Sequence, residues 1–160
     1  MEDPDATLLI SDVAREVLFE IAPQEMPIFP AASRAYFADP QSALKQAQPK
    51  DDVLGFGVDA LAVVVTPAVL YVLSKVFELL TGVAKKAIED GLAKEISEVI
   101  RAMFKKFHSS RSEIPSVLTR EHIGLIHSNV LQAAKKLRLP AQQAQALANA
   151  VTAQLVLPKE

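Results

Sequence analysis

Apolar residues recur every three or four positions along much of this chain, which is the spacing of one face of an α-helix. The first such run places four apolar side chains on one face: Leu9, Val13, Val17 and Ile21. Pro23 ends the run, because proline lacks the N–H group that a helix interior requires. The pattern therefore predicts an amphipathic first helix.

Prolines interrupt the next segment at four positions: Pro27, Pro30, Pro40 and Pro49. They exclude a long helix there. One short helix is predicted over about residues 30–38, and a second begins at Pro40 with Asp39 as its N-cap. We expect three aromatic side chains to fix this segment to a neighbouring element: Phe29, Tyr36 and Phe37.

An apolar stretch over residues 53–74 contains one charged residue, Asp59, in twenty-two positions. As a helix it would be about 33 Å long, enough to cross a hydrocarbon layer of about 30 Å. With Asp59 at the interface, however, only fifteen residues remain before Lys75, fewer than the usual minimum of about 17. The stretch is therefore short for a permanent membrane span.

A helix that is hydrophobic on every side is buried either in protein or in lipid. The sequence leaves both interpretations open for this stretch. In either case the same side chains would be buried, in the protein core or in the membrane: Leu61, Val63, Val64, Val65, Val69, Leu70, Val72 and Leu73. The other helices have enough apolar faces to cover one central helix.

From Lys75 onward the pattern becomes amphipathic, and it continues to about residue 108. Gly82 and Gly91 predict either two helices that meet at one of these glycines or one long bent helix. Five basic residues here are candidate contacts for anionic headgroups or for a protein partner: Lys85, Lys86, Arg101, Lys105 and Lys106.

Residues 117–158 predict a helical hairpin, with Thr119 as the N-cap of its first helix and Pro140 at the start of its second. The second helix carries no charge over residues 141–157. Uncharged helix faces are typical of helix–helix contacts. We therefore expect Leu147, Val151 and Leu155 to form a face that binds a partner helix or a second copy of the chain. The alternative is that the hairpin only closes the bundle.

Charge is distributed unevenly, although the net charge is only −2. Residues 1–52 contain ten acidic and four basic residues, whereas residues 75–111 contain eight basic and five acidic ones. Acidic residues lie among the basic ones throughout, which argues against nucleic-acid binding. The acidic N-terminal segment also lacks the pattern of a cleavable signal peptide, so we expect a cytoplasmic protein or one associated with the cytoplasmic side of a membrane.

Candidate chemistry is sparse in this sequence. It has no cysteine, which excludes disulfides and thiolate sites. His122 and His127 are five residues apart and fall on different sides of a helix, and the serines near His108 lack the context of a catalytic nucleophile. We expect no enzyme activity, cofactor, metal or small-molecule substrate.

The sequence as a whole predicts an all-α fold, a bundle of about five to seven helices around a central apolar helix at about residues 53–80, ending in a C-terminal helical hairpin. Its segments, residues 1–52, 53–108 and 117–158, should form one compact domain. The layout resembles in general arrangement the pore-forming domains of bacterial colicins, in which amphipathic helices cover an apolar one, although no motif of that family is present. The chain is also smaller than those domains and lacks their paired apolar hairpin, so the similarity is in layout only. From the apolar stretch we expect a non-enzymatic protein that engages or inserts into a membrane through its central helix, as an effector, pore-forming or anchoring component. The alternative is a soluble helical adaptor or scaffold that binds a protein partner or itself.

Overall fold

The computed structural model describes residues 4–47, 65–107 and 117–156, which fold into seven α-helices and one 3₁₀-helix. The predicted all-α class is confirmed. In chain order the elements are α1 (Pro4–Ile21), η1 (Pro23–Ile28), α2 (Phe29–Ala38), α3 (Pro40–Ala47), α5 (Thr66–Glu89), α6 (Ile96–Met103), α7 (Arg120–Lys136) and α8 (Ala141–Ala153).

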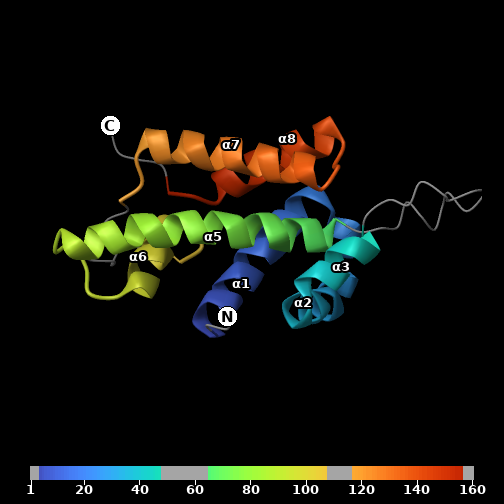
Figure 1. Ribbon diagram of the computed structural model, residues 1–160, viewed down its shortest axis with the longest axis horizontal. Coiled ribbons are helices and arrows are strands. Elements are labelled where there is room, and N and C mark those ends of the chain that lie inside the picture. The colour runs from blue at the N-terminus through green and yellow to red at the C-terminus, as the bar shows by residue number, and fades with distance from the viewer. Residues whose placement is uncertain (1–3, 48–64, 108–116, 157–160) are drawn as a thin grey trace, which may run out of the picture.

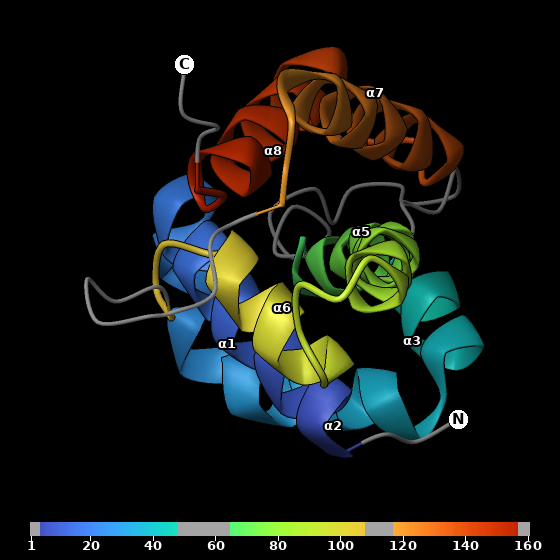
Figure 2. The same ribbon diagram turned by 90° about the vertical axis from the view of Figure 1, so that its left-hand side faces the viewer.

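Helix α5 runs through the middle of the molecule (Figure 1). The α7–α8 hairpin lies along one side of it, and α1, α2, α3 and α6 lie on the other sides (Figure 2). Helices α1, α2, α3, α6 and α7 all contact α5, whereas α8 packs mainly against α7 and α1. Five of the other described helices therefore pack around α5.

The central helix extends beyond its predicted C-terminal end. It continues to Glu89, beyond the expected end near residue 80, because its amphipathic part is continuous with its apolar part. Of the two candidate glycines, Gly82 lies inside the helix and Gly91 follows its end with φ of +79°. Glycine tolerates this left-handed conformation at little cost. Residues 53–64 of the predicted helix lie outside the described residues.

Short polar residues fix the ends of two other helices. The Asp39 carboxylate accepts a hydrogen bond from the Ser42 N–H at 3.2 Å at the start of α3. At the start of α7, the Thr119 hydroxyl oxygen accepts from the His122 N–H at 3.1 Å, and His122 Nδ1 accepts from the Thr119 N–H at 3.1 Å. Both predicted N-caps are therefore present, and His122 has a local structural role.

The last helix is shorter than its uncharged sequence suggests. Helix α8 ends at Ala153, and Leu155 then forms an isolated antiparallel bridge with Phe104. Two backbone hydrogen bonds flank this bridge: Lys105 N–H to Gln154 O at 2.8 Å and Val156 N–H to Met103 O at 2.7 Å. The C-terminal end of the described chain is thus attached to the segment that follows α6.

Candidate functional site

Helix α5 consists of two parts with different surroundings, and the first is apolar. Residues 65–70 are buried at six consecutive positions. Six residues make more than one and a half helical turns, so protein covers every side of the helix there. Between residues 66 and 73 only Tyr71 is half-buried, and the others are buried. We call residues 66–73 the apolar part of α5.

The second part, residues 75–89, has one buried face and one charged face. Val76, Leu80 and Ala84 are buried, and the ring of Phe77 stacks on that of Phe104 with centroids 5.4 Å apart. The charged side chains on the opposite face are exposed: Lys75, Glu78, Lys85, Lys86 and Glu89. We call residues 75–89 the charged part of α5. This part has the pattern of an ordinary surface helix.

Among the described residues, α5 is the one helix long and apolar enough to cross a membrane by length and composition. Its most apolar 18 residues are 56% buried inside the bundle, and the core helix of a soluble protein can be equally long and apolar. Lys75 and Glu78 lie within residues 66–83 and form an exposed pair at 3.8 Å. If α5 crossed a bilayer alone, both charges would lie near its middle, at a cost of about 2.5–3.5 kcal/mol each.

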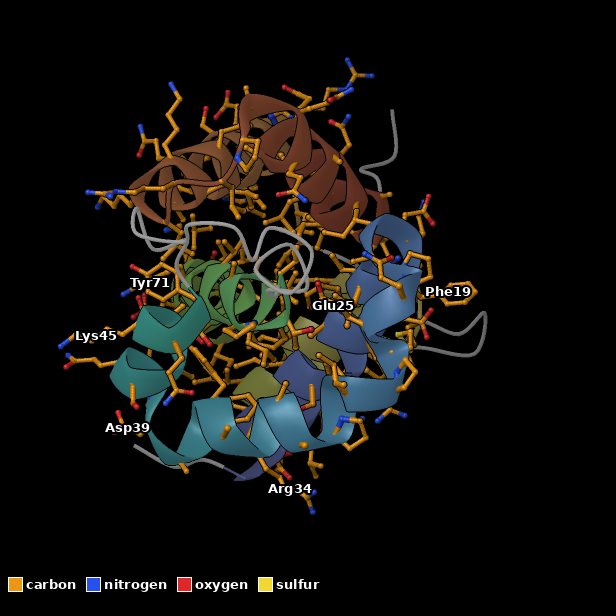
Figure 3. The ribbon with its side chains drawn as sticks, turned by 90° about the vertical axis from the view of Figure 1, so that its right-hand side faces the viewer. Phe19, Glu25, Arg34, Asp39, Lys45 and Tyr71 are labelled. Atoms are coloured by element: carbon orange, nitrogen blue, oxygen red, sulfur yellow. The ribbon has the colours of Figure 1, made fainter. Side chains whose placement is uncertain are left out.

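A buried carboxylate caps the beginning of α5 from a distant part of the chain. Glu25, in η1, is 7% exposed and points into the molecule toward α5 (Figure 3). Its Oε2 accepts a hydrogen bond from the Val65 N–H at 2.9 Å, and its Oε1 accepts from the Thr66 N–H at 2.9 Å and the Thr66 hydroxyl at 2.6 Å. The carboxylate thus lies at the helix end where the backbone dipoles favour negative charge.

Sequence reasoning did not identify Glu25 as important. It lies between Pro23 and Pro27 and matches no capping motif, since its partners are forty and forty-one residues away. The only indication in the sequence is negative: Val65, the N-cap residue, has no side-chain oxygen that could accept these hydrogen bonds.

Helices α2 and α3 cover one side of the apolar part of α5. In α2, Phe29 and Tyr36 are buried, as predicted for these aromatics, and Phe37 packs edge-on against Tyr36 with centroids 5.3 Å apart. Burial raises the pKa of the Tyr36 hydroxyl, and a hydrogen bond with Ser74 of α5 opposes this effect. Tyr36 thus contacts α5 directly, and Phe37, Ala43 and Leu44 of the cover pack against the core as partly buried side chains.

The five basic candidates are all exposed, but two of them already contact other groups. Lys106 Nζ forms an ion pair with Glu16 Oε1 of α1 at 3.0 Å. The Arg101 guanidinium lies 5.6 Å from the centroid of the Phe107 ring. Lys85 and Lys86 lie near the C-terminal end of α5, where cations interact favourably with the helix dipole.

The structure corrects the prediction of a partner face on the last helix. Leu147, Val151 and Leu155 are each 0% exposed and belong to the chain's own core. Helix α8 packs against α7 and α1, so the hairpin closes the bundle and these side chains are not on a surface open to a partner. Their uncharged surroundings reflect intramolecular packing.

The predicted apolar residues of the central helix divide by position. Val65, Val69, Leu70, Val72 and Leu73 are buried in the core, at 7% exposure or less. Leu61, Val63 and Val64 lie outside the described residues. The five described members of this set are therefore in contact with protein.

Two exposed apolar side chains of α1 were not singled out from the sequence. Leu8 and Phe19 are each 62% exposed, and Phe19 points away from the molecule (Figure 3). They are eleven residues apart, close to three full helical turns, so they project from the same side of α1. Sequence analysis assigned the apolar residues of α1 to its buried face and therefore missed this exposed pair.

The described residues contain no group of three or more side chains able to hold a metal ion. His127 of α7 instead contacts Asn149 of α8, with Nε2 and Oδ1 3.0 Å apart. This contact joins the two helices of the hairpin. No family model, curated protein or solved structure matches this chain.

Proposed function

We propose that this chain is a non-enzymatic helical protein that engages a membrane through its apolar stretch, residues 53–74, after the bundle uncovers it. In the closed bundle the apolar part of α5 is protected from water. In the membrane-bound form it contacts lipid, and the charged part remains at the headgroups.

One observation carries this proposal: residues 65–70 are buried at consecutive positions, so this segment has no polar face. A segment without a polar face is stable only inside protein or inside lipid. The change of character at Lys75 supports a boundary there, because the exposed lysines and glutamates begin where the apolar stretch ends.

The charged part of α5 supports an interfacial position for the residues after Ser74. Lysines near an anionic membrane surface each contribute about 1 kcal/mol to binding. Lys85 and Lys86 are exposed and adjacent, and their aliphatic stems can extend toward headgroups. Lys75 and Glu78 would then remain outside the hydrocarbon.

Vesicle flotation of the purified full chain tests the proposal. We expect it to float with vesicles that contain phosphatidylglycerol and to resist a carbonate wash. The double variant Lys85→Ala/Lys86→Ala should bind about tenfold more weakly or worse. Lys135→Ala/Lys136→Ala, another exposed lysine pair at a helix end, is the matched control and should bind like the wild type. Failure of the wild type to float with any vesicle would refute the proposal.

A second candidate function is self-association through α1. It is favoured by one observation, the shared direction of Leu8 and Phe19 on the outside of that helix. In this case Leu8→Ser/Phe19→Ser would remove a dimer that sedimentation detects in the wild type. Leu125→Ser, which changes an exposed leucine of α7, would leave the dimer intact. A monomeric wild type at high concentration would exclude this candidate.

A further inference from the structure

Glu25 and Thr66 join two parts of the chain between which α2 and α3 lie. Glu25 belongs to η1, immediately before α2, and Thr66 begins α5. Their side chains and the adjacent backbone meet through three hydrogen bonds of 2.6–2.9 Å. The contact therefore holds the start of the α2–α3 segment directly against the first turn of the central helix.

A carboxylate is an energetically demanding group for this position, because burial of a charge must be offset by hydrogen bonds. Here two backbone N–H groups and one hydroxyl of α5 supply that compensation, and Thr66 itself is 0% exposed. If the contact separates, the carboxylate can return to water, while the first turn of α5 loses its cap. Each of the three hydrogen bonds therefore contributes to keeping the carboxylate buried.

The remaining attachment of α2 and α3 to the bundle has few fully buried side chains, although Phe37, Ala43 and Leu44 pack against the core as partly buried ones. Helix α2 contributes two buried large side chains, Phe29 and Tyr36. In α3, every residue whose side chain is described is half-buried or exposed. By contrast, α1, α7 and α8 each contribute four or more buried residues to the core. Among the helices that cover α5, α2 and α3 therefore contribute the fewest fully buried side chains to the core.

We infer that Glu25 is the contact that keeps the α2–α3 segment closed over the apolar part of α5, and that separation of its carboxylate from Val65 and Thr66 opens this side of the central helix. The opening is local, and it occurs in water without a membrane. Its consequence for lipid binding rests on the proposed function, whereas the opening itself does not.

Hydrogen exchange of the full chain in membrane-free buffer tests the inference. Glu25→Gln keeps the size of the side chain but replaces one acceptor oxygen with an NH₂ group, which then faces an N–H donor. We expect exchange to become about tenfold faster or more for the amides of α2, α3 and the apolar part of α5. Protection in α7 and α8 should stay as in the wild type.

Asp39→Ala is the control, because it removes another carboxylate cap at an exposed site. It should speed exchange only in the first turn of α3. Thr66→Val is a second variant that keeps the shape of residue 66 and removes one of the three hydrogen bonds. It should give the same regional pattern as Glu25→Gln with a smaller increase, so the test does not depend on one variant.

Two results would overturn the inference. One is faster exchange by the same factor in all helices, which would make Glu25 a contributor to global stability only. The other is unchanged exchange in the apolar part of α5 for both variants. Flotation of Glu25→Gln separates this inference from the proposed function: local opening without increased vesicle binding supports the role of Glu25 and contradicts membrane engagement.

Discussion

The two parts of α5 belong to one continuous helix but differ in polarity and in burial. Residues 66–73 have no polar face and are enclosed by other helices, whereas residues 75–89 bury one face and expose a row of lysines and glutamates. The charged part would be stable as an ordinary surface helix. The apolar part depends entirely on what covers it, and for this reason we place the function there.

A charge in the apolar part should have the largest effect on the fold. Leu70→Asp would place an unpaired carboxylate at a position that is 0% exposed. We expect a loss of about 4 kcal/mol or more, enough to unfold much of the protein. Lys85→Asp, in the charged part of the same helix, should cost about 1 kcal/mol or less. Urea unfolding followed by circular dichroism measures both, and equal effects would contradict the distinction.

Removal of one leucine side chain from each part should give a smaller difference in the same direction. Leu73 is fully buried and Leu79 is half-buried. Leu73→Ala should lower the free energy of unfolding by about 2–5 kcal/mol, because it leaves a cavity in the core. Leu79→Ala should cost clearly less, since water can fill the vacated space. A larger loss for Leu79→Ala in denaturant titrations would show that the two parts are wrongly assigned.

The two glycines near the end of the charged part should give the smallest effects, with opposite signs. Gly82 lies in the helix with open space around the position of a Cβ atom, so Gly82→Ala should stabilise the protein by about 0.5–1 kcal/mol. Gly91 has a φ of +79°, and Gly91→Ala should destabilise it by about 1–2 kcal/mol. Thermal unfolding of both variants checks this pair. Stabilisation by Gly91→Ala would show that the helix does not end there.

Much of the fold could be predicted because it depends on local patterns. The buried stripe of α1, the caps at Asp39 and Thr119, and the start of the last helix after Pro140 all follow from short stretches of sequence. The all-α class follows from the same periodicity. Such features are decided within a few residues, so a single sequence contains them.

The features that the sequence did not predict depend on distant contacts. Glu25 caps a helix forty residues away, and Leu155 leaves its helical pattern to pair with Phe104. The uncharged last helix was expected to offer a partner face, but Leu147, Val151 and Leu155 fill the chain's own core, because a stripe that fits a partner fits a neighbouring helix equally well. The periodicity of apolar residues shows that a helix face is buried, but it does not show which element buries it.

The surroundings of residue 71 test the central claim most directly. The chain has no tryptophan, so Tyr71→Trp introduces a single tryptophan reporter within the apolar part of α5. Leu125→Trp, on α7, is its control. With anionic vesicles, we predict strong quenching of the residue 71 reporter by lipids brominated in the middle of the acyl chain, and none of the residue 125 reporter. Unchanged fluorescence of the residue 71 reporter with and without these vesicles would contradict the claim that this helix meets lipid.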